Sequence, residues 1–100
     1  MSKLSHYSRV VVHPSRGMEF LRLMTHVAEE SRKENGCVAF VVLKSRHEAQ
    51  TYCISSIWAT EADWELHTHT QHFIDQMVFE DGGGVLSFVY TEEYYIVSSV

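Results

Sequence analysis

The sequence predicts a single α+β domain with the element order β-α-β-β-α-β. Residues 18–34 carry apolar side chains at the three- and four-residue spacing of an amphipathic helix. Two strand-like runs follow, separated by a short polar segment, as in an antiparallel hairpin. A second helical stretch then ends at three consecutive glycines, and a last strand-like run closes the chain. This order is that of the ferredoxin-like fold with its antiparallel sheet.

Length and composition restrict the class of protein. The 100 residues suffice for one compact core, so residues 1–100 are expected to form one domain. The net charge of -5 and the lack of a basic stripe argue against nucleic-acid binding. The longest apolar runs, such as "VAFVVL", are too short for a membrane span.

The N-terminal segment and the cysteines point to the cytoplasm. The first nine residues are polar and lack the apolar centre of a signal peptide. Cys37 and Cys53 form no close motif, and the expected hairpin places them too far apart for a disulfide. We therefore expect a cytoplasmic protein with two reduced thiols.

The first half of the chain begins with a β-branched strand, "RVVVH", from Arg9 to His13, which the turn sequence "PSRG" stops. The helix over 18–34 ends at "ENG", because Asn and Gly tolerate the left-handed backbone that closes helices. Its apolar side is formed by Phe20, Leu21, Met24, Val27 and Ala28.

The second half contains the hairpin, a helical region and the last strand. The hairpin strands are expected over 37–45 and 51–59. Thr60 is a good N-cap for a helical region that extends to about Glu80. Val85 to Val100 is again strand-like, interrupted by the polar "TEE". The Gly82–Gly84 segment is either a mobile lid or, as favoured here, a plain connector.

The hairpin has two apolar faces. Pairing Lys44 with Tyr52 puts Leu43, Val41 and Ala39 on one face with Cys53, Ser55 and Ile57; the other face carries Val42, Phe40, Val38, Ile54, Ser56 and Trp58. Two helices can cover only one face of the sheet. We therefore expect a homodimer in which a second copy covers the other face.

The stretch "WELHTHTQHF" places His67, His69 and His72 within six positions. On one continuous helix these side chains diverge, and the HExxH spacing is absent, so no metal site is expected. If Thr70 instead caps a fresh helix at Gln71, His67 and His72 could turn toward one pocket. The alternative is an ordinary helix that buries Leu66, Phe73 and Met77 and leaves the histidines at its edges, which is favoured for His69.

Several short motifs together resemble the antibiotic biosynthesis monooxygenase family. They are the strand and turn "RVVVHPSRG", the strand entry Glu34-Asn35-Gly36-Cys37, the aromatic Trp58, the pair Glu61-Ala62, and the series His67, Thr70 and His72-Phe73. The resemblance extends from about Arg9 to Tyr90. It implies a dimeric α+β barrel with a pocket between helices and sheet in each protomer.

The family that the chain resembles has mixed activities. It includes oxygenases that use neither metal nor flavin, enzymes that process a furanone-type autoinducer, and haem-degrading enzymes. The spacing of Trp and His in the haem-degrading members falls here on His67 and Met77, which argues against haem breakdown. Many relatives have an acidic residue where this chain has Ser56.

The resemblance leads to a hypothesis of cofactor-independent oxidation of an electron-rich aromatic or quinol by dioxygen. His67 is expected as the catalytic base and His72 as its orienting or anion-stabilising partner, because an imidazole titrates near neutral pH. The expected substrate-binding walls are Trp58, Trp64, Phe40 and Phe73. The alternatives are a non-catalytic dimer that binds a small hydrophobic molecule, and an isomerase for an autoinducer-type signal.

Overall fold

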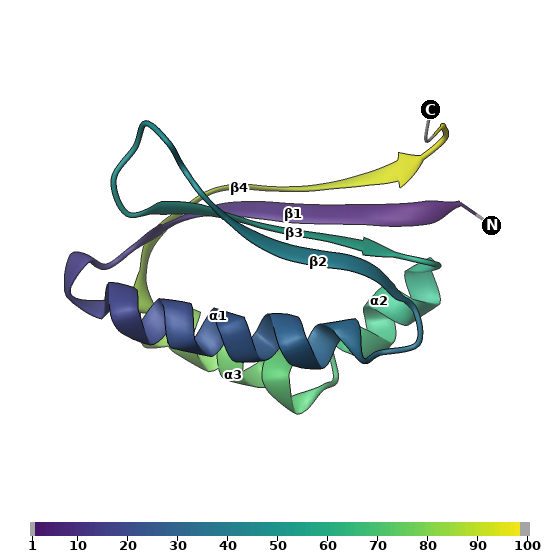
Figure 1. Cartoon of the computed structure of the whole chain (residues 1–100), viewed down its shortest axis with the longest axis horizontal. Coiled ribbons are helices and arrows are strands. Elements are labelled where there is room, and N and C mark those ends of the chain that lie inside the picture. The colour runs from purple at the N-terminus through teal and green to yellow at the C-terminus, as the bar shows by residue number, and fades with distance from the viewer. Residues whose placement is uncertain (1, 99–100) are drawn as a thin grey trace.

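The computed structural model describes residues 2–98 and contains a four-stranded antiparallel sheet with the order β2-β3-β1-β4. The strands are β1 (Lys3–Val12), β2 (Cys37–Lys44), β3 (Thr51–Trp58) and β4 (Val85–Ile96). The helices α1 (Gly17–Arg32), α2 (Glu61–His67) and α3 (Gln71–Phe79) all lie on one face of the sheet (Figure 1). This arrangement confirms the ferredoxin-like α+β prediction.

Strand β1 is longer, and strand β4 is more continuous, than predicted. β1 starts at Lys3 rather than Arg9, because residues 3–12 pair with β4 and residues 4–11 also pair with β3. The inward-facing residues His6 and Ser8 are polar, so this part of the strand lacks the alternating apolar residues by which a strand is recognised in a sequence. The "TEE" segment does not interrupt β4, since it pairs with residues 6–8 of β1. Residues 99 and 100 lie outside the described part of the chain.

The β2–β3 hairpin has the predicted register over most of its length. Lys44 pairs with Tyr52 and Val42 with Ile54, as expected. A bulge between Cys37 and Ala39 then shifts the pairing, so that Cys37 faces Trp58. The prediction that Val38 shares a face with Phe40 and Trp58 is therefore wrong, because Phe40 and Trp58 are buried and Val38 is 51% exposed.

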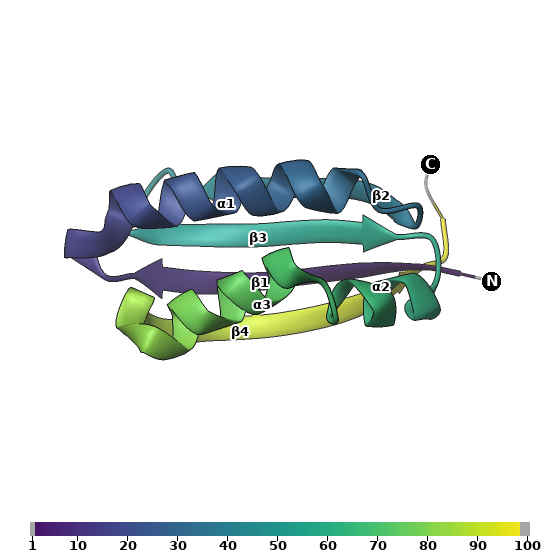
Figure 2. The same cartoon turned by 90° about the horizontal axis from the view of Figure 1, so that it is seen from below.

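The predicted helical region from Thr60 to Glu80 is divided into two helices. Thr60 caps α2 by accepting a hydrogen bond from the backbone N–H of Asp63, as predicted. Thr70 caps α3 in the same way, by accepting from the backbone N–H of Phe73. Leu66, which the alternative of one ordinary helix would bury, is 67% exposed. Figure 2 shows α2 and α3 as separate segments across the sheet.

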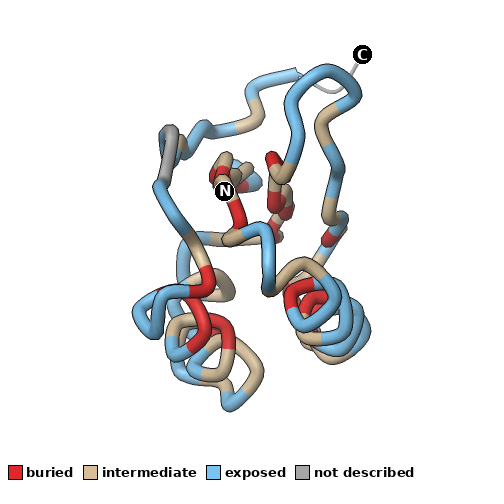
Figure 3. The backbone as a smooth tube through the Cα atoms, turned by 90° about the vertical axis from the view of Figure 1, so that its left-hand side faces the viewer, coloured by how far each residue is buried: buried red, intermediate tan, exposed pale blue. Residues whose placement is uncertain are grey.

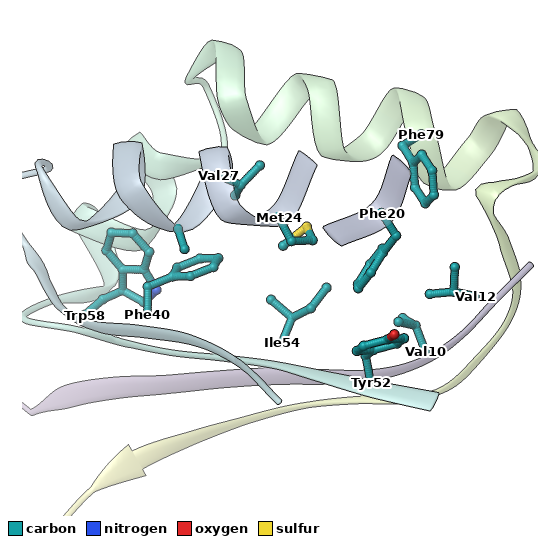
Figure 4. Close-up of a cluster of buried hydrophobic side chains, with 11 residues drawn as sticks. Val10, Val12, Phe20, Met24, Val27, Phe40, Tyr52, Ile54, Trp58 and Phe79 are labelled. Atoms are coloured by element: carbon teal, nitrogen blue, oxygen red, sulfur yellow. The ribbon is translucent and has the colours of Figure 1, made fainter. Parts of the chain in front are cut away.

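The hydrophobic core lies between the helices and the inner face of the sheet (Figures 3 and 4). The sheet contributes Val10, Val12, Phe40, Tyr52, Ile54 and Trp58, and the helices contribute Phe20, Met24, Val27, Ala28 and Phe79. No helix covers the opposite face of the sheet (Figure 1), where Leu43 is 52% exposed. Both cysteines are free thiols. Within residues 2–98, no helix is long and apolar enough to cross a membrane.

Gly36 lets the turn after α1 pack closely against the start of α2. The carbonyl of Gly36 accepts a hydrogen bond from the N–H of Ala59, and a Cβ at position 36 would overlap the side chain of Asp63. The Asp63 side chain is held by Thr60, whose hydroxyl donates to it. The neighbouring residue Glu34 is thereby kept close to α2.

We expect Gly36→Ala to lower the free energy of unfolding by about 1–3 kcal/mol, because the added methyl group must displace the capped start of α2. Urea denaturation followed by circular dichroism measures the change. The matched control is Gly82→Ala, since a Cβ at position 82 would meet no atom within 4 Å. Equal stability of the two variants would contradict this account of Gly36.

Candidate functional site

One carboxylate oxygen of Glu34 joins the two histidines that flank the helix break. Glu34 follows the C-terminal end of α1, His67 ends α2, and His72 lies in the first turn of α3. Oε2 of Glu34 lies 2.7 Å from Nδ1 of His67 and 2.8 Å from Nε2 of His72. Both distances are those of hydrogen bonds to a charged acceptor.

The segment between the helices creates this convergence. The N–H of Thr70 and its hydroxyl both donate to the carbonyl of His67, which turns the chain before α3 begins. A continuous helix would have sent the two histidines in different directions, so the alternative of a fresh helix at Gln71 is confirmed. His69 lies in the turn and is exposed, as predicted.

Glu34 was not among the residues predicted for the site. Its sequence signal is weak, because an acidic residue near the end of an amphipathic helix normally faces solvent. Only the packing of the turn after α1 against α2 brings it to the histidines.

His67 is enclosed by aromatic rings and is 1% exposed. The centroid of its ring lies 4.4 Å from that of Trp58, 5.3 Å from Phe73 and 5.4 Å from Trp64. This burial lowers the pKa of His67 below its usual value, although the hydrogen bond and charge of Glu34 act in the opposite direction. The neutral imidazole is therefore favoured.

A cavity of about 250 Å³ lies beside His67, between the sheet and the helices. Its wall is mainly apolar, with polar groups at a few positions, as in pockets for small molecules. The lining residues are His6, Ser8, Phe40, Ile54, Ser56, Trp64, His67, Phe73, Gln76, Met77, Glu80 and Thr91.

The structure brings four of the six predicted site residues to the cavity wall: Phe40, Trp64, His67 and Phe73. Trp58 instead lies in the core behind the wall, fully buried, and its Nε1–H donates to Oγ of Ser56 at 2.9 Å. His72 also lies off the wall and reaches His67 through Glu34. Ser56 thus holds the side chain of a core tryptophan.

Two titratable residues of the cavity wall, His6 and Glu80, were missed by the sequence analysis. The ring of His6 stacks on Trp64 with a centroid distance of 4.0 Å, and burial lowers its pKa. Glu80, at the end of α3, is buried, and loss of hydration raises the pKa of its carboxyl group. Both residues lay in segments interpreted as a polar N-terminus and a helix end.

Glu34, His67 and His72 are also the described residues that could hold a metal ion. One ligand atom from each lies within 4.8 Å of the others. Two imidazoles and one carboxylate form a common ligand set for divalent transition metals. No metal site was predicted because the three histidines alone do not converge, and Glu34 was not included. Whether a metal ion binds to Glu34, His67 and His72 is a question for an assay with a chelator.

The glycine segment after α3 forms a tight turn, η2 (Glu80–Gly84), rather than an extended loop. Gly83 has a φ of 86°, and the space beside Gly84 is filled by the ring of Phe79. The Arg16 side chain lies over that ring and donates to the carbonyl of Gly82. These contacts fit the connector interpretation better than the mobile lid.

Comparison with known proteins gives a family match over most of the domain. The family model described as "Antibiotic biosynthesis monooxygenase" matches residues 7–77. This range contains Glu34 and both histidines of the site, and it ends before Glu80. No curated protein matches the chain.

Solved structures share the whole fold at low sequence identity. The protein PA3566 of Pseudomonas aeruginosa superposes with a TM-score of 0.87 and 18% identity, covering 98% of this chain and 97% of that one. A candidate antibiotic biosynthesis monooxygenase of Deinococcus radiodurans superposes with a TM-score of 0.86 and 15% identity, covering 98% of this chain and 95% of that one. A conserved protein of Methanosarcina mazei superposes with a TM-score of 0.82 and 21% identity, covering 96% of this chain and 92% of that one.

We expect Glu34→Gln to lower the pKa of His67 further, because the substitution removes the charge that favours the imidazolium form. The free energy of unfolding should fall by about 1–3 kcal/mol, since an amide oxygen is a weaker acceptor for two imidazole donors. Proton NMR titration of His67 and urea denaturation measure the two effects. Glu61→Gln, at an exposed position of α2, is the control. An unaltered titration of His67 in Glu34→Gln would contradict this role.

Proposed function

Because the chain belongs to the antibiotic biosynthesis monooxygenase family, we propose that it oxidises a small electron-rich aromatic or quinol-type substrate with dioxygen and without a cofactor. The observation that carries this proposal is the buried His67 ring, which contacts Glu34 on one side and lines a mainly apolar cavity. A base of this kind can remove a proton from a phenol or enol, after which the substrate itself supplies the electrons.

The hydrogen bond to Glu34 assigns the proton of His67 to one ring nitrogen. With Nδ1–H donating to the carboxylate, Nε2 keeps its lone pair, and no hydrogen-bond partner of Nε2 exists among the described residues. The burial that lowers the pKa of His67 keeps the ring neutral before reaction. Glu34 then stabilises the imidazolium that forms when Nε2 accepts the substrate proton, as the carboxylate does in a serine-histidine-aspartate triad.

The electron balance of the reaction needs only the substrate and dioxygen. The deprotonated quinol passes one electron to dioxygen, and the two radicals combine to form a carbon–oxygen bond at a ring carbon. The proton held by His67 returns to the peroxide. Loss of water then breaks the oxygen–oxygen bond and leaves a carbonyl, so that hydroquinone and dioxygen give hydroxyquinone and water.

The other predicted site residues have supporting roles in this proposal. Phe40, Trp64 and Phe73 form the wall that contacts the substrate ring and excludes water. His72 is a positioning residue, because it acts on His67 through the shared oxygen of Glu34. The cavity volume of about 250 Å³ is just below the range of roughly 300–1,000 Å³ that is usual for ligand pockets, which favours a substrate of one or two rings.

We also propose that the protein is a cytoplasmic homodimer that pairs through the uncovered face of the sheet. This face carries Val41 and Leu43 on β2, both exposed, together with an aromatic cluster. In that cluster, Tyr7 of β1 stacks on Tyr94 of β4 and meets Tyr90 edge-on. An apolar surface of this kind is typical of a subunit interface. The two free thiols support a reducing compartment.

The second candidate is a non-catalytic dimer that binds a small hydrophobic molecule. It is favoured by Ser56, whose hydroxyl accepts a hydrogen bond from a core tryptophan and donates to the backbone carbonyl of His6. No carboxylate is therefore available at the position where many relatives have one. An isomerase for a phosphorylated signal has less support, because no lysine or arginine lines the cavity among the described residues.

We expect His67→Gln to lower the rate of oxygen consumption with quinols of one or two rings by roughly 10²–10⁴-fold, the usual contribution of a general base. The fold should be retained, which circular dichroism checks. His69→Gln is the matched control, because His69 is exposed in the turn between α2 and α3. An unchanged rate in His67→Gln would exclude His67 as the base.

The same oxygen-electrode assay separates the alternatives. Uptake that a chelator does not affect supports the metal-free reaction. Uptake that the chelator abolishes would assign Glu34, His67 and His72 to a metal ion instead. Binding of these compounds by the wild-type protein without oxygen consumption would support the second candidate, the non-catalytic binding dimer.

We expect the wild-type protein to sediment as a dimer at micromolar concentration and Leu43→Glu to shift it to the monomer, because the charge would be buried between the two sheets. Analytical ultracentrifugation measures both states. Leu66→Glu is the control, since Leu66 is equally apolar and exposed but lies on α2. A monomeric wild-type protein would refute the sheet-face interface.

A further inference from the structure

The proposed reaction needs a hydrogen-bond donor for the anion that forms when His67 takes a proton from the substrate. His72 was expected as an orienting or anion-stabilising partner, but it lies off the cavity wall and contacts Glu34 instead. An anion in a mainly apolar cavity is costly unless a donor contacts it. The donor must therefore come from the residues that line the cavity.

His6 presents an imidazole to this cavity from the sheet. It lies on the inward face of β1 and lines the same cavity as His67. Its ring stacks on Trp64 with a centroid distance of 4.0 Å and an interplanar angle of 22°, which fixes the plane of the imidazole. The residue is half-buried, and its backbone is covered because β1 pairs with a strand on each side. The accessible part of His6 is therefore its side chain.

The imidazoles of His6 and His67 share Trp64 as a neighbour. The ring centroid of His67 lies 5.4 Å from that of Trp64, and the centroid of His6 lies 4.0 Å from it. The two imidazoles cannot lie farther apart than these two distances taken together. Both rings therefore belong to the same part of the cavity wall.

The surroundings of His6 favour a neutral ring with a free donor. Burial lowers the pKa of His6; the charge of Glu93, its partner on β4, opposes this, and a positive charge on His67 adds to it. A neutral imidazole carries one N–H donor. No hydrogen-bond partner of the His6 ring exists among the described residues. The N–H group can therefore donate to a ligand, and a neutral imidazole can stabilise an oxyanion in this way.

We infer that His6 is a further catalytic residue, whose ring N–H donates a hydrogen bond to the substrate anion while His67 holds the substrate proton. The inference rests on the proposed function of His67 and deepens it, since it makes the cavity a site for the anions of weak oxygen acids such as phenols and enols. The proton moves from the substrate to Nε2 of His67. The N–H proton of His6 stays on its ring.

Other polar groups of the cavity wall are engaged, shielded or open to water. The hydroxyl of Ser56 donates to a backbone carbonyl, and the amide of Gln76 donates to Glu80. The second carboxyl oxygen of Glu80 has almost no accessible surface. Ser8 is buried, and Thr91 is exposed, so that water competes for its hydroxyl. The imidazole on β1 is therefore the donor best suited to the anion.

The test measures the ionisation of bound 4-nitrophenol, whose anion is detected by its visible absorption. Wild-type protein should raise the ionisation constant above its value in water. His6→Phe keeps a ring beside Trp64 but lacks the donor, so it should lower the constant of the bound ligand by roughly tenfold to a hundredfold, the strength of a hydrogen bond to a charged group. His6→Gln should retain most of the effect, because its amide can donate. His47→Phe, at an exposed position of the β2–β3 loop, is the matched control.

A wild-type protein that binds the neutral phenol in preference to its anion, or that does not bind 4-nitrophenol, would overturn the inference, and neither result depends on whether a variant folds. An unchanged ionisation constant in His6→Phe, with its fold checked by circular dichroism, would overturn it as well. The titration does not require turnover. Lack of oxygen uptake with quinols would therefore reject the proposed reaction and leave anion binding by His6 as a separate result.

Discussion

The shared acceptor on Glu34 is the interaction on which the rest of the site depends. One carboxylate oxygen receives hydrogen bonds from His67 and His72, and these three residues lie on three different helix ends. The bonds therefore fix the directions of α2 and α3 relative to α1. The same bonds determine which nitrogen of the buried imidazole carries the proton. A substitution that weakens these hydrogen bonds should therefore change both the packing of the helices and the pKa of His67.

The cavity follows from this arrangement of helices. Because α3 starts afresh at Thr70, its inward side chains run along the sheet from Phe73 to Glu80 and leave a space above His6 and Ser8. These two polar residues of β1 replace the large apolar side chains that would otherwise fill the space. The result is a mainly apolar cavity whose wall includes the imidazole of His67 and the buried residue Glu80. A cavity of about 250 Å³ with such a wall can hold a small flat ring.

The fold also explains why an interface is expected on the opposite side of the sheet. All three helices lie on one face, and the second face presents exposed aliphatic and tyrosine side chains. Pairing two such faces would bury these side chains and leave each cavity within its own protomer. The reaction geometry proposed for His67 uses residues of one chain alone, so assembly and chemistry can be tested independently.

The sequence by itself determined the order of the strands, most of the hairpin register and the helix cap at Thr60, and it offered Thr70 as a second cap, because these depend on local periodicity and local hydrogen bonding. It also marked Phe40, Trp64, His67 and Phe73 as candidate site residues, and all four line the cavity. Tertiary structure decided the partnership of Glu34 with the histidines, the place of Trp58 behind the wall, the stacking of His6 on Trp64 and the burial of Glu80. Each arises from contacts between segments far apart in the chain, where a polar residue gives no local sign that folding will remove it from water.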